Sequence, residues 1–250
     1  MIMTEDELRY GDAERQVVDV LVPPGPAHRI ALCYLHGGGW YGGRRQDFAE
    51  HLDHFAGRGH VVASVGYRIE EETGYRDKIG DVAAGLRSFR ALLAERAPET
   101  DRIVLLGSSA GAHLATMLAL RPEDRDATPP VVGCVAINPP GTMIPWPGLN
   151  SGLRTKIDWL RRDGSTAEEM SPERQVGPGC PPFLFPLAEY EHIFPHDQVR
   201  ALAERIERHG GRAETFVVPG TKHGFVYRLG SPATDLTLAR IEAFLDRLGG

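Results

Sequence analysis

Three short motifs carry residue types that can do acyl-transfer chemistry. The run GSSAG places Ser109 between Gly107 and Gly111, and the run LHGGGWYGG holds three consecutive glycines at positions 37–39. Further along, the run PGTKHGFVY carries His223. A serine hydroxyl activated by a histidine base, with backbone N–H groups that bind a developing oxyanion, is the machinery of nucleophilic acyl transfer.

The turn around Ser109 joins a strand-like run to a helix-like run with almost no loop between them. Residues 102–106 read RIVLL and residues 112–121 read AHLATMLALR. A turn this tight strains its middle residue and pushes the hydroxyl out above the strand ends, and the N-terminus of the following helix favours negative charge there. We therefore expect Ser109 to be the nucleophile and Ser108 to pack beside the strand.

The glycine loop offers backbone donors. Consecutive glycines leave N–H groups uncovered, and we expect Gly37 and Gly38, with Ala110 from the serine turn, to bind the oxyanion of a tetrahedral intermediate. Such a loop can also cradle phosphate, but the G-K-[ST] ending of a P-loop is missing from the sequence. Each motif is a weak signal alone, and the order of glycine loop, serine and histidine strengthens all three.

The runs between these motifs predict the elements that must hold them together. Short apolar, β-branched runs typical of buried strands alternate with helical patterns. The expected strands are residues 16–22, 30–36, 60–68, 102–107, 131–138, 183–188 and 213–219, and the expected helices are residues 79–97, 112–121, 197–210 and 234–248. This alternation predicts a single α/β domain over residues 1–250, with a mostly parallel sheet covered by helices on both faces.

One stretch interrupts the alternation. Residues 139–180 are rich in proline and glycine and hold one helical pattern, residues 153–162. The stretch follows the end of an expected strand, where α/β folds place functional loops. We interpret it as an excursion over the site rather than a second domain, and a surface insertion without a role is the alternative.

The amino-acid composition of the chain argues against several classes of binding partner. Among 250 residues, 42% are hydrophobic and 25% charged, which is ordinary for a globular protein, and a net charge of −6 without a basic run argues against nucleic acid. Three cysteines show no metal-ligand spacing, and no apolar stretch approaches the ~20 residues of a membrane span. The first residues lack the layout of a signal peptide, so we expect a cytoplasmic protein with no metal and no membrane partner.

Together these motifs resemble the esterase and lipase group of the α/β-hydrolase fold that is related to hormone-sensitive lipase and the small microbial acetylesterases. The resemblance covers most of the chain and rests on YGDAERQVVDVLVP, LHGGGW, VGYR, DRIVLLGSSAGAHLA, SPERQVGPGCPPFL and KHGF. It implies an α/β-hydrolase fold with a short cap excursion and no cofactor. It also implies Ser109 as nucleophile, His223 as base, and an acid on the loop after the penultimate strand.

The acid loop departs from the pattern of that group. The group reads PPFLLIHGxxDxxVP, whereas this chain reads PPFLFPLAEYEHIFP. A match without gaps places Leu187 and Ala188 at the His-Gly pair and Glu191 at the aspartate. Glu189, two residues upstream on the same side of an extended segment, competes for the role. Asp197 stands at a helix start, where the N-terminal dipole alone favours an acid, so we give it a structural role.

The reaction expected from these residues is hydrolysis of a small-molecule carboxylic ester, with short acyl chains favoured by the short excursion. An amidase such as an arylformamidase shares the machinery. A non-hydrolytic lyase, a cyclase or a binding protein on the same fold is the alternative from another class, motivated by the changed acid loop. Trp40, Tyr41, Trp146 and Tyr190 are expected to line an apolar pocket, although each also fits a core position. The sequence leaves open whether the chain forms a homodimer.

Overall fold

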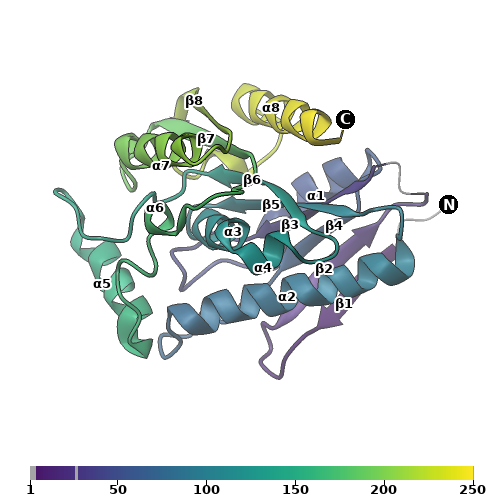
Figure 1. Cartoon of the computed structure of the whole chain (residues 1–250), viewed down its shortest axis with the longest axis horizontal. Coiled ribbons are helices and arrows are strands. Elements are labelled where there is room, and N and C mark those ends of the chain that lie inside the picture. Colours follow the sequence, from purple (N-terminus) through teal and green to yellow (C-terminus); the bar gives the residue numbers. More distant parts are fainter. Residues whose placement is uncertain (1–3, 26–27, 250) are drawn as a thin grey trace.

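A computed structural model of the chain describes residues 4–25 and 28–249, and an eight-stranded sheet runs through its centre (Figure 1). The order across the sheet is β1-β2-β4-β3-β5-β6-β7-β8. The two pairs that involve β2 are antiparallel, and every pair from β4 to β8 is parallel. The strands are β1 (Thr4–Arg9), β2 (Val17–Val22), β3 (Ile30–Leu35), β4 (Val62–Val65), β5 (Arg102–Ser108), β6 (Val131–Ile137), β7 (Phe183–Tyr190) and β8 (Ala213–Lys222).

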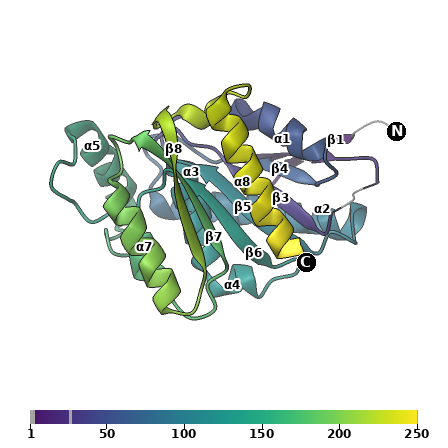
Figure 2. The ribbon, with the colours of Figure 1, turned by 90° about the horizontal axis from the view of Figure 1, so that it is seen from above.

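Helices cover both faces of this sheet. The helices are α1 (Ala49–Ala56), α2 (Tyr75–Arg96), α3 (Ala110–Leu120), α4 (Pro122–Arg125), α5 (Ser151–Leu160), α6 (Pro172–Gln175), α7 (His196–Arg208) and α8 (Pro232–Gly249), with short 3-10 turns η1 (Arg45–Phe48), η2 (Arg161–Asp163) and η3 (Phe225–Tyr227). One buried cluster joins the sheet to α2, α3 and α7, and a second joins it to α1 and α8. Figure 2 looks onto the face that α8 crosses.

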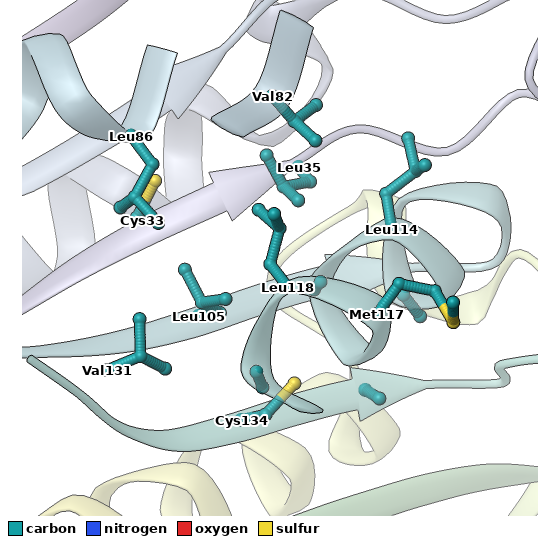
Figure 3. Close-up of a cluster of buried hydrophobic side chains, with 14 of the residues drawn as sticks. Cys33, Leu35, Val82, Leu86, Leu105, Leu114, Met117, Leu118, Val131 and Cys134 are labelled. Atoms are coloured by element: carbon teal, nitrogen blue, oxygen red, sulfur yellow. The ribbon is translucent and has the colours of Figure 1, made fainter. Parts of the chain in front are cut away.

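The two clusters follow from the alternation of side chains along each buried strand. On β3, Cys33 and Leu35 belong to the cluster on the α2 and α3 face, whereas Leu32 and Tyr34 belong to the opposite one. Figure 3 shows Cys33 and Leu35 facing side chains of α2 and α3. Helix α3 is buried along its whole length, which explains why its sequence is apolar on all sides.

The α/β-hydrolase architecture expected from the sequence is confirmed. Each of the seven expected strands overlaps one observed strand, and each expected helix overlaps an observed helix. The sequence pattern missed β1 and α1. The residues of β1 read TEDELR, a polar segment at the sheet edge, and α1 is too short to show a clear helical period.

The stretch 139–180 contains α5, η2 and α6. Figures 1 and 2 both show α5 at one end of the molecule, beyond the sheet. The interpretation of this stretch as an excursion within one domain stays a prediction. Among the described residues, none of the helices is both long and apolar enough to cross a lipid bilayer.

Parallel strands bring distant segments to one edge of the sheet. The glycine loop follows β3, the serine turn follows β5, the acid loop follows β7 and the histidine follows β8. These four strands run in parallel, so their carboxyl ends lie at the same edge. This is where open α/β sheets place their sites.

Candidate active site

Ser109 occupies a strained turn between β5 and α3. Its backbone angles are φ 55° and ψ −118°, a conformation that costs a residue with a side chain about 1–3 kcal/mol. The turn is held because the Ser109 N–H donates to the Ile137 carbonyl at 2.8 Å. The strain therefore comes from the fold, and it exposes the hydroxyl at the end of the strand.

The two glycines that flank the serine pair are required by close backbone contacts. A Cβ atom added to Gly107 would overlap the backbone of Gly111, and a Cβ atom added to Gly111 would overlap the Leu35 carbonyl. The missing side chain at Gly107 lets the turn close on itself, and the missing side chain at Gly111 lets the turn approach the end of β3. The G-x-S-x-G spacing is therefore required by backbone packing as well as by the chemistry of the serine.

The structure brings Ser109, His223 and Glu191 into one hydrogen-bonded chain. Ser109 Oγ lies 2.8 Å from His223 Nε2, and His223 Nδ1 lies 2.6 Å from Glu191 Oε2. A carboxylate only accepts hydrogen bonds, so Nδ1 carries the proton and Nε2 accepts from the serine hydroxyl. This is the tautomer that a general base needs in order to take a proton from serine.

Glu191 is held in place by its own loop. Its Oε1 accepts from the N–H groups of Ile193 at 2.7 Å and Phe194 at 3.2 Å, and its side chain is only 2% exposed. Burial by itself disfavours the carboxylate form. The hydrogen bond and charge of His223, together with these two N–H groups, outweigh burial and keep the pKa of Glu191 below its usual value.

The two other acids near this loop point elsewhere. Glu189 is exposed, and its Oε2 accepts from the Gly220 N–H at 2.8 Å. Asp197 lies in the first turn of α7 and pairs with Arg200 on the surface. Of the three carboxylates that the sequence brought into question, the structure places Glu191 on the histidine.

Asn138 links the acid loop to the histidine loop. Its Oδ1 accepts from the Ala188 N–H at 2.7 Å, and its Nδ2 donates to the His223 carbonyl at 2.9 Å. Reasoning from the sequence missed this residue, although its place at the end of β6, between β5 and β7, is a signal that could have identified it. Asn138 also has φ 47°, a conformation that asparagine tolerates better than most residues.

The glycine loop packs tightly against the serine turn. A Cβ atom on Gly37 would overlap the Tyr227 hydroxyl and would lie 3.5 Å from Ser109 Cβ. Within the described residues, the N–H groups of Gly38 and Ala110 donate to no protein acceptor. The assignment of Gly37, Gly38 and Ala110 as oxyanion donors stays a prediction.

Two histidines hold this loop in shape. His36 Nδ1 donates to the Gly37 carbonyl at 2.8 Å. Trp40 Nε1 donates to His113 Nδ1 at 3.1 Å, and His113 Nε2 donates to the Met170 carbonyl at 2.7 Å. Burial lowers the pKa of both histidines to about 4, so both rings are neutral at pH 7, as His113 must be to accept from Trp40. The histidine on α3 thus connects the glycine loop to the excursion.

We expect Gly38→Val to lower turnover roughly 10²–10³-fold, the cost of losing one oxyanion donor. Gly38 has φ +112°, which valine rarely adopts, and a Cβ atom there would overlap the Gly42 carbonyl and lie 2.6 Å from the Gly43 nitrogen. The loop must therefore move, and its N–H groups move with it. Steady-state kinetics on a soluble ester measure the loss.

The matched control for this variant is Gly177→Val, because a Cβ atom at Gly177 meets nothing within 4 Å. It should keep the turnover of the parent protein. Parent-like turnover in Gly38→Val would instead assign the glycines a purely structural role.

A pocket of about 790 Å³ opens over the Ser109 hydroxyl. Its lining combines the glycine loop, the hydrogen-bonded Ser109 and His223, the acid loop and the first half of α5. The lining residues are Gly37, Gly38, Gly39, Gly43, Asp47, Ser109, Asn150, Gly152, Leu153, Lys156, Ile193, Phe194, His223 and Tyr227.

The four aromatic residues expected to line the pocket lie outside its lining, which corrects that expectation. Trp40 is fully buried against His113, and Tyr41 packs edge-on against Trp159. Trp146 packs against Phe194, and Tyr190 is 51% exposed at the end of β7. The apolar wall is instead formed by Leu153, Ile193 and Phe194. Aromatic type alone does not indicate which way a side chain faces.

Comparisons with known proteins identify the family to which this fold belongs. A family model described as the alpha/beta hydrolase fold matches residues 32–227. Esterase LipC of Mycobacterium tuberculosis is 27% identical over 268 residues, which cover 96% of this chain and 64% of that protein. The acetyl esterase of Salmonella paratyphi A is 26% identical over 246 residues, which cover 87% of this chain and 71% of that protein. This chain spans between 49% and 64% of the length of LipC and two further curated relatives.

Solved structures show the same architecture. Esterase Est2 of Thermogutta terrifontis, with propionate bound, superposes with a TM-score of 0.79 at 25% identity, covering 98% of this chain and 94% of that one. The family match covers most of the chain. The chain therefore belongs to the α/β-hydrolase fold family.

Proposed function

We propose that this protein is a serine esterase that hydrolyses carboxylic esters with short acyl chains through an acyl-enzyme. The observation that carries the proposal is the hydrogen-bonded chain Ser109–His223–Glu191 at the floor of a pocket. The comparisons support it, because LipC and the Thermogutta protein are both named esterases.

In the first half-reaction, Ser109 Oγ attacks the ester carbonyl while His223 Nε2 takes the hydroxyl proton. The carbonyl oxygen becomes an oxyanion, which we expect the N–H groups of Gly37, Gly38 and Ala110 to bind. The imidazolium formed in this step is stabilised by the buried Glu191 carboxylate. Collapse of the intermediate breaks the C–O bond of the ester, and His223 returns the proton to the leaving alkoxide.

The second half-reaction repeats this chemistry with water. His223 takes a proton from a water molecule, the resulting hydroxide attacks the acyl carbon, and collapse releases the carboxylic acid from Ser109 Oγ. The proton returns to the serine through His223, so the base ends each cycle neutral.

The preference for short acyl chains rests on two observations. The stretch 139–180 contributes Asn150, Gly152, Leu153 and Lys156 to the pocket, and because only Leu153 among them is apolar, this stretch adds little apolar wall for a long chain. The similar Thermogutta terrifontis esterase has been solved with propionate and with butyrate bound. An amidase would use the same residues, and no observation on the pocket favours an amide over an ester.

Two measurements test the proposal. A fluorophosphonate probe should label Ser109, as the similar Thermogutta protein is phosphonylated by sarin. A panel of 4-nitrophenyl esters from acetate to octanoate, with an aryl formamide added, should show the highest kcat/KM at short chains. Folded protein that takes up no probe would favour a binding protein or a non-hydrolytic enzyme, and a preference for the formamide would make it an amidase.

A further inference from the structure

We propose that Lys156 selects esters that carry a carboxylate group close to the scissile bond. This inference rests on the proposed esterase function and names its substrate class. It begins from a lysine that the reaction itself does not use and that lines the same pocket as Ser109 and His223.

The ammonium group of Lys156 lies over the glycine loop. It is near enough that a Cβ atom added to Gly39 would stand 2.6 Å from Lys156 Nζ. The side chain leaves α5, is partly buried, and lies against Gly39 of the glycine loop. A substrate whose carbonyl oxygen is bound by the neighbouring Gly38 would therefore have Lys156 close to the groups attached to its reacting carbon.

Among the residues that the structure describes, the ammonium group of Lys156 has no counterion. Within residues 4–25 and 28–249 it joins no carboxylate in an ion pair and donates no hydrogen bond. The acid in the same pocket, Asp47, is already engaged, since its Oδ2 accepts from the Arg44 N–H at 2.8 Å and its Oδ1 lies 3.5 Å from Arg44 Nε. The unpaired charge in the pocket is therefore the positive charge of Lys156.

An unpaired cation in a partly apolar pocket loses hydration, and an anionic ligand compensates for that loss. A carboxylate on the substrate supplies this partner and at the same time fixes the orientation of the ester. In the alternative role for Lys156, its positive charge stabilises the oxyanion of every substrate. The two roles differ in one measurable respect, because only the first depends on a charge carried by the substrate.

Two pairs of esters test this difference. The first pair is 3-acetoxybenzoate and 3-acetoxybenzamide, which places the charge on the alcohol side. The second is 4-nitrophenyl hemiglutarate and its methyl-capped ester, which places it on the acyl side, with spontaneous hydrolysis subtracted. The Lys156→Met change should lower kcat/KM for both esters of a pair by different factors. In at least one pair, we expect the loss for the charged ester to be roughly 10- to 100-fold larger than the loss for its neutral partner. Lys156→Arg should keep the preference, and added salt should weaken it.

The matched control is Arg154→Met, which removes an exposed cation from the same helix. It should treat both members of each pair as the parent protein does. A second readout needs no turnover. In Ser109→Ala protein, 3-acetoxybenzoate should protect Lys156 from acetylation by an N-hydroxysuccinimide ester, while exposed Lys222 stays reactive.

Three results would overturn the inference. Hydrolysis of neutral esters without any preference for charge would refute it while leaving the esterase proposal intact. An equal loss for both members of each pair in Lys156→Met would assign the lysine to the oxyanion. Absence of hydrolysis together with absence of probe labelling at Ser109 would remove the esterase proposal, and this inference would fail with it.

Discussion

Ser109→Ala is expected to abolish ester hydrolysis while the protein stays folded. The hydroxyl is the group that would form the covalent bond, and His223→Ala should cost about as much, because nucleophile and base act as one unit. In a well-studied serine protease the loss of either is about 10⁶-fold in kcat. Rates on 4-nitrophenyl acetate, with thermal unfolding as the check on folding, measure both variants.

Ser108→Ala is the matched control. Ser108 is fully buried at the end of β5, and within the described residues its hydroxyl has no hydrogen-bond partner. Its removal should leave turnover near that of the parent protein. If Ser109→Ala kept most of the activity and Ser108→Ala lost it, the nucleophile would be the other serine of the turn.

Glu191→Gln should lower turnover about 10⁴-fold, the loss seen when the acid of a triad protease becomes an amide. In this structure the reason can be followed atom by atom. The side-chain oxygen of glutamine can still accept from the N–H groups of Ile193 and Phe194, which turns its NH2 group toward His223 Nδ1. Nδ1 must then accept, so the proton moves to Nε2, and the ring can no longer take a proton from Ser109.

Glu189→Gln separates this mechanism from a general effect of charge. The Glu189 carboxylate is exposed and, within the described part of the chain, accepts only from the Gly220 N–H, which an amide oxygen can also satisfy. We expect a change of less than a few fold in kcat/KM, measured on the same ester. A larger loss in Glu189→Gln than in Glu191→Gln would identify Glu189 as the acid of the triad. Small losses in both variants would mean that another group orients His223.

The sequence alone determined the fold class and the residue types of the candidate site. The alternation of apolar runs predicted the strands and helices, because burial on both faces of a parallel sheet demands such runs. The order of HGGGW, GSSAG and KHGF predicted which residues meet. The position of Glu191 followed from a match of local sequence without gaps, and in the structure this residue directly follows the last residue of β7.

Tertiary structure decided what depends on contacts between distant segments. Asn138 joins the loops after β7 and β8, and although its place at the end of β6 marks it as a candidate, only the fold shows which two loops it joins. Trp40 lies in the core on His113 and not in the pocket, because its orientation is set by packing against α3. The cation of Lys156 reaches the glycine loop across more than a hundred residues of sequence. Local sequence fixes which element a residue joins, but the direction of its side chain depends on which other elements pack against it.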